Sequence, residues 1–203
     1  MRAPALITLE GLDGCGKSTQ IERLGEYLRG AGARVVVTRE PGGTQLGERI
    51  REVVLDENLT PEAELALMCA SRAQSVSEII RPALVEGAYV LCDRFHDATE
   101  AYQGGGRGMD REAIATLHRV LCGDLMPDLT LILDLEPTLA LARARKLPQA
   151  SRFEAENGEF FARVAAAYRE IAVREPRRCR LIPAAGSIAE VETRLRAAVD
   201  DVA

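Results

Sequence analysis

The sequence predicts an α/β fold in which a five-stranded parallel sheet is flanked by helices. Three observations support this prediction. Short runs rich in Val, Ile and Leu alternate with longer stretches of helical periodicity. This composition is expected of strands that are covered on both faces of a parallel sheet. A glycine-rich segment also follows the first run directly. Strands that alternate with helices in this way are joined by right-handed crossovers.

The expected elements follow one another along the chain. Strands are predicted at residues 5–10, 34–38, 88–92, 129–135 and 178–182. Helices are predicted at residues 17–30, 46–55, 61–86, 110–122, 138–146, 159–174 and 188–199. Pro61 favours the first turn of its helix, because Thr60 before it can cap the free backbone N–H groups.

One segment interrupts this alternation. Residues 146–158 have the sequence KLPQASRFEAENG, and Pro148 and Gly158 oppose a regular helix there. We therefore predict a mobile loop at this place. The chain is expected to form a single domain over residues 1–203, with this loop as a short lid.

Composition excludes several classes of protein. The 203 residues are 47% hydrophobic, which is enough for one full core. A net charge of −5 argues against DNA or RNA as a partner, since proteins that neutralise polymer phosphates carry basic surfaces. The five cysteines include no CxxC pair, and no run of 18 apolar residues occurs. We expect a soluble protein of the reducing cytoplasm, without disulfide framework, zinc site or membrane span.

The segment GLDGCGKST indicates a nucleoside triphosphate site. Its pattern Gly11-x4-Gly16-Lys17-Ser18 is a full Walker A motif between a predicted strand and a predicted helix, as the motif requires. Glycines let backbone N–H groups surround the β-phosphate, and the helix directs its positive end at the same anion. Lys17 is expected to bridge the β- and γ-phosphates, and the Ser18 hydroxyl to help hold Mg²⁺. The predicted ATP contacts are Gly11, Leu12, Asp13, Gly14, Cys15, Gly16, Lys17, Ser18 and Thr19.

Other interpretations of this loop are less favoured. A glycine turn with no ligand is one, but a chance match of this pattern arises in about one chain in a hundred of this length. Cys15 is better explained as a small tolerated side chain than as a redox sensor. No Asn-Lys-x-Asp tetrapeptide occurs, which weakens the case for a guanine-specific switch and leaves other ATPases open.

A second polar pocket is predicted from two further segments. Arg72 falls on the inward apolar stripe of its helix, one turn from Met68. Asp93 and Arg94 follow the third strand, at the carboxyl end of the sheet where ligands bind. Asp93 could hold Mg²⁺ through water, and Arg94 could bind a nearby phosphate. The alternatives are an Arg72 guanidinium that reaches solvent and an ordinary surface pair of Asp93 with Arg94.

Basic residues cluster around the predicted lid, namely Arg143, Arg145, Lys146 and Arg152. A solvated charged face is the usual explanation of such a cluster. The alternative is a lid that closes arginines over a phosphoryl group in transfer. Phosphoryl transfer requires in-line positioning, charge stabilisation and exclusion of water, and a mobile basic loop meets the last two needs.

Taken together, these segments resemble the bacterial thymidylate kinase (dTMP kinase) family. The motifs are EGLDGCGKST, TREPGGT, ASRAQ with RPAL, LCDRF with AYQGGGRG, PDLTLILDL and ARARKLPQASRFE. They occur in the family's order from residue 6 to about residue 170. A Walker A motif alone is unspecific, whereas DR and AYQGGGRG downstream of REPGGT are highly specific for this family. The resemblance implies a P-loop NTPase of the nucleoside monophosphate kinase type.

The resemblance also implies roles for individual residues. Asp13 corresponds to the contact with the sugar 3′-hydroxyl of the monophosphate. Glu40 and Arg51 match residues with which the family holds the acceptor phosphate and its surroundings. Arg94 is similarly placed against that phosphate. Arg72 matches the arginine that bonds the thymine carbonyl.

Further matches and departures concern the base pocket. Thr99 and Gln103 match polar contacts to the base, and Tyr102 matches the ring under the deoxyribose. The family usually stacks a phenylalanine on thymine where this chain has Met68, which keeps an apolar contact but not a flat ring. Ala98 replaces a position that is often hydroxylated.

The resemblance places the catalytic charge on the lid. Gly14 stands where some relatives carry a phosphate-loop arginine, so lid arginines are expected to replace it, Arg152 first and then Arg145 and Arg143. The predicted catalytic residues are Lys17, Arg94, Arg152, Arg145 and Arg143.

The expected function is transfer of the γ-phosphoryl group of ATP to dTMP, giving dTDP for dTTP synthesis. Mg²⁺ is the expected cofactor, near Ser18 and Asp93, and the family implies a homodimer. The alternatives are a kinase for another nucleoside monophosphate or a deoxynucleoside and, less favoured, a nucleotide switch on the same scaffold.

Overall fold

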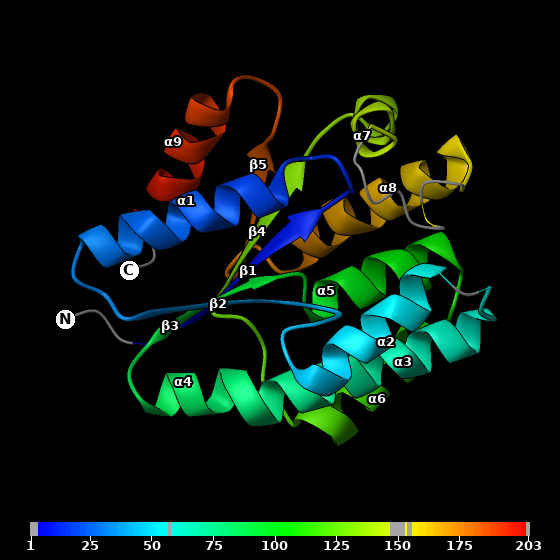
Figure 1. The fold of residues 1–203 in the computed structure, drawn as a ribbon. Coiled ribbons are helices and arrows are strands. Elements are labelled where there is room, and N and C mark those ends of the chain that lie inside the picture. Colours follow the sequence, from blue (N-terminus) through cyan, green and yellow to red (C-terminus); the bar gives the residue numbers. More distant parts are fainter. Residues whose placement is uncertain (1–3, 57, 147–152, 154–155, 202–203) are drawn as a thin grey trace.

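The computed structural model describes residues 4–56, 58–146, 153 and 156–201. They contain a five-stranded sheet in the order β2-β3-β1-β4-β5, with every neighbouring pair parallel (Figure 1). The strands are β1 (Leu6–Gly11), β2 (Val35–Arg39), β3 (Tyr89–Asp93), β4 (Leu129–Asp134) and β5 (Cys179–Pro183). The predicted parallel sheet is confirmed, and each predicted strand falls within one residue of its observed bounds.

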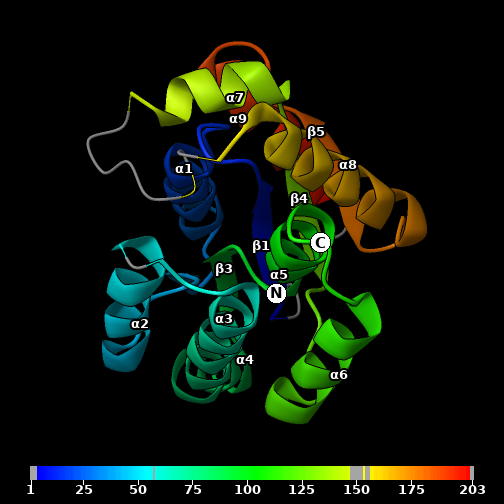
Figure 2. The same cartoon turned by 90° about the vertical axis from the view of Figure 1, so that its right-hand side faces the viewer.

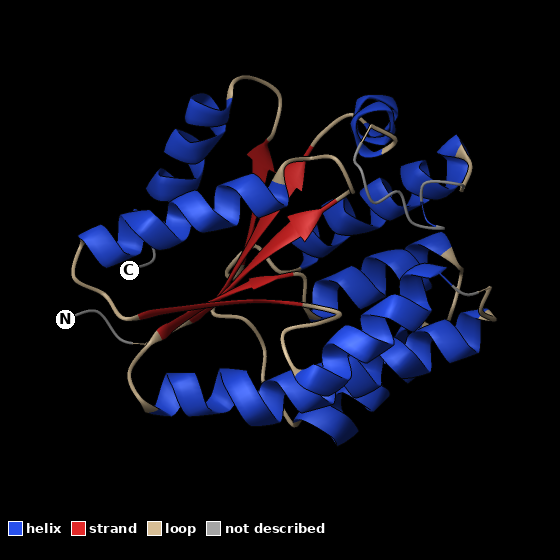
Figure 3. Cartoon of the chain, viewed as in Figure 1, coloured by secondary structure: helices blue, strands red, loops and turns tan. Residues whose placement is uncertain are grey.

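Helices connect the strands and flank the sheet (Figure 3). The helical segments between β1 and β3 are α1 (Lys17–Gly30), α2 (Gln45–Asp56), α3 (Pro61–Ser75), η1 (Val76–Ile80) and α4 (Arg81–Val85). Those after β3 are α5 (His96–Thr99), η2 (Glu100–Gly106), α6 (Arg111–Cys122), α7 (Pro137–Ala144), α8 (Gly158–Arg174) and α9 (Ile188–Asp200).

The helix predicted at residues 61–86 begins as the sequence indicates. Pro61 is its first residue, and the Thr60 hydroxyl accepts a hydrogen bond from the backbone N–H of Ala63 at 3.3 Å. Such a cap is worth about 1 kcal/mol. The helix changes to π-type hydrogen bonding over η1 before it ends as α4. The helical periodicity of residues 61–86 predicts one regular helix and gives no sign of this change.

One helical segment, directly after β3, is not among the helices predicted from the sequence. Residues His96–Gly106 form α5 and η2 directly after β3. Gly105 and Gly106 allow this segment to pack on α8, because a Cβ at Gly105 would lie 2.5 Å from the Cβ of Ala167. Of the predicted lid, residues 147–152, 154 and 155 lie outside the described part of the chain.

Helices cover both faces of the sheet (Figure 2). Helices α1 and α9 pack together on one face, and α4, α5 and α8 contact the other. Successive strand residues point to opposite faces, so Leu6 packs with Val90 and Ile80, whereas Ile7 joins the larger cluster with Leu24 of α1. No described helix is both long and apolar enough to cross a membrane.

Candidate active site

The carboxyl ends of β1 and β3 bring the two predicted ligand segments together. These strands are neighbours, with Leu9 paired with Asp93, so the loop after β1 faces the residues after β3. The backbone N–H of Arg94 donates to the Leu9 carbonyl at 3.0 Å. The adjacency therefore follows from strand order, which the sequence alone does not fix.

The loop after β1 has a backbone that requires glycine. Gly11, Gly14 and Gly16 all have positive φ angles, of 130°, 80° and 100°. A Cβ at Gly14 would lie 2.3 Å from the carbonyl oxygen of Ala140 and 3.1 Å from the Cβ of Arg143. The end of α7 thus packs directly on the phosphate loop, so any side chain at position 14 would displace it.

Lys17 is the first residue of α1, and its ammonium group folds back over this loop. Its Nζ donates to the carbonyl oxygens of Gly11 at 3.2 Å and Leu12 at 3.0 Å. The side chain is buried, and the Cys15 sulfur lies 3.9 Å from Nζ. Burial raises the pKa of the Cys15 thiol, which favours an inert side chain over a redox sensor.

Ser18 and Asp93 offer oxygen ligands beside the loop. The Ser18 hydroxyl lies 3.5 Å from Oδ2 of Asp93, and Oδ1 of Asp93 is buried with no partner among the described residues. The described ranges contain no group of three or more His, Cys, Asp or Glu side chains that could hold a metal ion. Two oxygen ligands fit Mg²⁺, which usually keeps several waters and takes phosphate oxygens as further ligands.

Arg94 joins the phosphate loop to the neighbouring cavity. It is the only described residue other than glycine with a positive φ, at 70°. Its Nη1 donates to the Gly11 carbonyl at 3.0 Å and to the Tyr168 hydroxyl at 3.2 Å. Its Nη2 donates to Oδ1 of Asp13 at 2.7 Å and to the Tyr102 hydroxyl at 3.2 Å. The guanidinium is therefore held at the junction of the two sites.

Asp13 is charged in this arrangement. Burial acts to raise its pKa, but the cations of Arg94 and Lys17 overcome that effect and hold the pKa well below its usual range. Its second oxygen accepts a hydrogen bond from the Tyr102 hydroxyl at 2.9 Å. Asp13 thus stays a charged acceptor between the two cations of the site.

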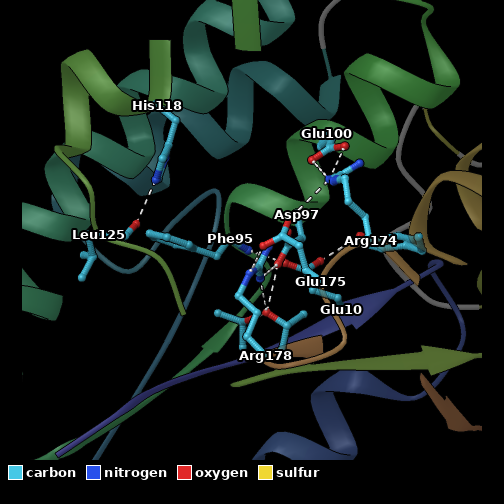
Figure 4. Close-up of polar contacts among 12 residues, drawn as sticks. Glu10, Phe95, Asp97, Glu100, His118, Leu125, Arg174, Glu175 and Arg178 are labelled. Carbon is cyan, nitrogen blue, oxygen red and sulfur yellow. Dashed lines mark hydrogen bonds and ion pairs between the residues drawn. The ribbon is translucent and has the colours of Figure 1, made fainter. Parts of the chain in front are cut away.

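Behind Arg94 lies a buried acid that the sequence analysis does not identify. Glu10 accepts hydrogen bonds from the Tyr168 hydroxyl at 2.8 Å and from the backbone N–H of Phe95 at 2.7 Å. Burial raises the pKa of Glu10 to about 8, and the nearby charge of Asp97 adds to the shift (Figure 4). The only sequence signal for the role of Glu10 is its position: it is a charged residue near the end of an apolar strand, directly before the phosphate loop.

Asp97 belongs to a second buried network that was also missed. Its two oxygens accept hydrogen bonds from Arg178 at 2.7 and 2.8 Å, and the Thr130 hydroxyl donates to it at 2.9 Å (Figure 4). Arg178 directly precedes β5, and Thr130 lies in β4. This network anchors α5, and with it the start of the segment that carries Tyr102 and Gln103, to the sheet.

Arg72 faces the interior, as its place on the apolar stripe predicts. Its side chain is 1% exposed, so the alternative of a guanidinium that reaches solvent is wrong. Nε donates to Glu40 at 2.8 Å, and Nη2 donates to the Phe95 carbonyl at 2.9 Å and to the Thr99 hydroxyl at 2.7 Å. Nη1 of Arg72 and Oε1 of Glu40 are buried without a partner in the described structure.

A cavity that is open to solvent on one side lies beside these residues. Seven of the nine predicted substrate residues line it: Asp13, Glu40, Arg51, Met68, Arg94, Tyr102 and Gln103. The other two, Arg72 and Thr99, bond to each other, and Arg72 also bonds to Glu40, which does line the cavity. Val54, Leu55, Ala98 and Phe153 add apolar surface. The cavity thus has a charged end at Arg94 and apolar walls, which suits a ligand with a phosphate and a ring.

The structure describes two of the three predicted lid arginines, Arg143 and Arg145. Arg143 lies in the last turn of α7, against the phosphate loop, and Arg145 directly follows that helix. Arg152 lies outside the described residues. The basic cluster therefore begins beside the loop that Lys17 covers.

Comparison with known proteins agrees with this arrangement. The family model described as thymidylate kinase matches residues 9–195. A thymidylate kinase of Pseudomonas syringae pv. tomato is 52% identical over 93% of this chain and 91% of its own length. One of Pseudomonas fluorescens is 54% identical with the same coverage. The crystal structure of thymidylate kinase from Ehrlichia chaffeensis superposes with a TM-score of 0.79 at 34% identity, over 98% of this chain and 99% of that one. Similarity of this extent in sequence and in fold shows that the chain belongs to the thymidylate kinase family.

Proposed function

We propose that this chain transfers the γ-phosphoryl group of ATP to dTMP and releases dTDP and ADP, as a step in nucleotide biosynthesis. Its membership of the thymidylate kinase family supports this reaction. The observation that carries the proposal for the site is the position of Arg94. One guanidinium bonds both to the phosphate loop, through Gly11, and to Asp13 and Tyr102 of the neighbouring cavity.

The donor half of the site is the phosphate loop. Backbone N–H groups of residues 11–19 surround the β-phosphate, and Lys17 moves from the Gly11 and Leu12 carbonyls to the β- and γ-phosphates. We assign Mg²⁺ to Ser18 and Asp93, whose oxygens lie 3.5 Å apart. When bound there, Mg²⁺ would neutralise phosphate charge.

The acceptor half is the cavity. Arg94 and Arg51 bind the dTMP phosphate, with Glu40 in its surroundings, and Asp13 accepts a hydrogen bond from the sugar 3′-hydroxyl. Tyr102 packs under the deoxyribose. These assignments are supported by the cavity, which all five residues line.

The base occupies the part of the cavity lined by Met68 and Gln103. Arg72 donates to a thymine carbonyl through Nη1, which is buried and has no partner among the described residues. Thr99 fixes Arg72 through its hydroxyl, at 2.7 Å. The role of Thr99 in base binding is therefore indirect in this arrangement, because its side chain does not line the cavity.

Catalysis in this proposal is electrostatic, without a covalent intermediate. The transferring group spreads negative charge over its oxygens, and fixed cations stabilise that charge more than they stabilise the ground state. Lys17 and Arg94 supply two such cations. We assign the remaining charge to Arg152, then to Arg145 and Arg143, which arrive when the lid of residues 146–158 closes and excludes water.

We further propose a cytoplasmic homodimer in which each chain is one domain. Leu117, Val120 and Leu121 support a dimer, because they form an exposed apolar ridge at helical spacing on α6. Light scattering of the purified protein would give twice the 22.1 kDa chain mass. A monomeric mass at micromolar concentration would contradict the dimer but not the reaction.

An acceptor panel tests the proposed reaction. The purified protein is incubated with ATP, Mg²⁺ and, in turn, each nucleoside monophosphate and each deoxynucleoside, and ADP and the phosphorylated acceptor are quantified. We expect dTMP to give equal amounts of ADP and dTDP with the highest kcat/KM. A preference for another acceptor would identify a different kinase, and slow ADP release whatever the acceptor would indicate a nucleotide switch.

A further inference from the structure

A short hydrogen bond to a carboxylate fixes the orientation of the Gln103 side-chain amide. Gln103 lies in η2, is 1% exposed and lines the cavity. Its Nε2 lies 2.6 Å from Oε1 of Glu64, in α3. A carboxylate can only accept hydrogen bonds, so the amide NH₂ must face Glu64. The amide oxygen then points the other way, and it is buried with no partner in the described part of the chain.

Glu64 is itself held in place. It is fully buried, and Arg107 donates to its Oε2 from Nη2 at 3.1 Å and to its Oε1 from Nε at 3.5 Å. Arg107 also pairs with Glu156 and lies over the Phe160 ring, 4.7 Å from its centroid. Two donors of the Arg107 cation thus hold the Glu64 carboxylate in place beside the Gln103 amide.

A buried acceptor without a partner selects a ligand that brings a donor. Thymine and uracil carry a hydrogen on ring nitrogen N3, whereas N3 of cytosine is an acceptor. An acceptor placed against Gln103 Oε1 would leave two lone pairs facing each other in a dry site, at a large cost. A site built around one hydrogen bond therefore rejects the base that lacks the matching group.

We propose that Glu64, held by Arg107, is a positioning residue that turns the Gln103 amide so that its oxygen selects a pyrimidine with a hydrogen on N3. This inference rests on the proposed function, since it concerns the acceptor of that reaction. It predicts discrimination of dTMP and dUMP together from dCMP. Gln103 does not discriminate between dTMP and dUMP, which differ only in a methyl group on the base. Other residues of the cavity would make that discrimination.

Glu64→Gln tests the proposal. The amide that this substitution introduces can donate as well as accept, so Gln103 is free to present its NH₂ group to N3 of cytosine. We expect the ratio of kcat/KM for dTMP over dCMP to fall by between about fivefold and a hundredfold. The ratio for dTMP over dUMP should stay within about twofold. The matched control is Glu62→Gln, the same chemical change at an exposed position of the same helix, which should alter neither ratio.

A double variant separates positioning from a general loss of structure. In Glu64→Gln/Gln103→Glu, the introduced amide donates to the introduced carboxylate, whose other oxygen again offers only an acceptor to the base. Discrimination against dCMP should return to within about threefold of wild type, which a merely structural role of Glu64 would not produce. An unchanged dTMP-to-dCMP ratio in the folded single variant would overturn the proposal.

The wild-type protein gives an independent test if Glu64→Gln does not fold. N3-methyl-dTMP lacks the donor, and we expect its kcat/KM to be at least about tenfold below that of dTMP. Equal use of N3-methyl-dTMP and dTMP would overturn the proposal. Wild type that phosphorylates dTMP but shows neither effect refutes this inference alone, whereas wild type that fails to phosphorylate dTMP refutes the proposed function.

Discussion

Arg94 and Arg72 are both buried, but they are held in different ways. Arg72 is 1% exposed, lies in a regular helix and forms its ion pair with Glu40, which is equally buried. Arg94 is 12% exposed, has a left-handed backbone and divides its donors among a carboxylate, a carbonyl and two hydroxyls. The second set of partners stands at the mouth of a cavity, where a ligand can replace some of them.

The difference separates a structural arginine from an exchangeable one. Removal of Arg72 would leave the Glu40 carboxylate uncompensated in the interior, which is costly for the fold. Removal of Arg94 leaves Asp13 partly exposed and close to Lys17, so its charge is still balanced. Stability should therefore depend more on Arg72, and phosphoryl transfer more on Arg94.

The largest effect is expected for Arg94→Ala. The substitution removes a cation from the transferring group and keeps the Cβ, so the backbone strain at φ 70° is unchanged. We expect kcat/KM for dTMP to fall by about 10³-fold or more, while the melting temperature changes by only a few degrees. Steady-state kinetics and thermal unfolding check both parts. A loss of activity that merely follows unfolding would remove the distinction from Arg72.

Arg72→Met should produce the opposite pattern. The unfolding free energy is expected to fall by about 3–5 kcal/mol, because a buried charge loses its partner. Urea denaturation measures this change. Adding Glu40→Gln removes the unpaired charge, so the double variant should recover a large part of the stability. A double variant that is no more stable than Arg72→Met would show that the ion pair with Glu40 is not the reason why Arg72 stabilises the fold.

Glu10 should make stability depend on pH. Its folded pKa is raised to about 8 from 4.5, so the folded state binds the proton more tightly than the unfolded state. Its contribution is therefore fully present below about pH 4.5 and is lost as the pH rises to about 8. Relative to Glu10→Gln, wild type should lose on the order of 2–4 kcal/mol of unfolding free energy over that range. Urea titrations at several pH values measure the difference, and a flat difference would contradict it.

The smallest effect is expected at Met68. Met68 lines the cavity where the family usually has a stacking phenylalanine. Met68→Phe should lower the KM for dTMP by about twofold to tenfold, because a flat ring adds an aromatic contact of about 0.5–1.5 kcal/mol. The kcat should change little. A higher KM would show that the cavity has no room for the ring.

Much of the fold could be predicted from local sequence. The five strands are short and rich in Val, Ile or Leu, and the phosphate loop depends on glycines whose spacing is local. Arg72 could be placed inward because helical periodicity fixes the face on which a residue lies. The π-type bonding of η1 and η2 could not be read in this way, and η2 packs against α6 and α8, which both follow it in the chain.

The polar contacts behind the site are harder to predict. Tyr168 and Glu10 are 158 positions apart, and Asp97 and Arg178 are 81 apart. No local pattern marks such pairs, and each residue alone resembles an ordinary member of its helix or strand. Glu64 likewise stands in the first turn of α3, where an acidic residue is expected for reasons of the helix dipole. Only the folded arrangement shows that it faces Gln103.

The central claim is that Arg94 receives the acceptor phosphate and Arg72 does not. Calorimetric titration of dTMP and of thymidine, which lacks the phosphate, tests it most directly. Wild type should bind dTMP far more tightly than thymidine. Arg94→Ala should lose most of this preference and keep only the part that Arg51 supplies, whereas Arg72→Lys should weaken both and keep the difference between them. An Arg94→Ala protein that still prefers dTMP as strongly as wild type would contradict the account.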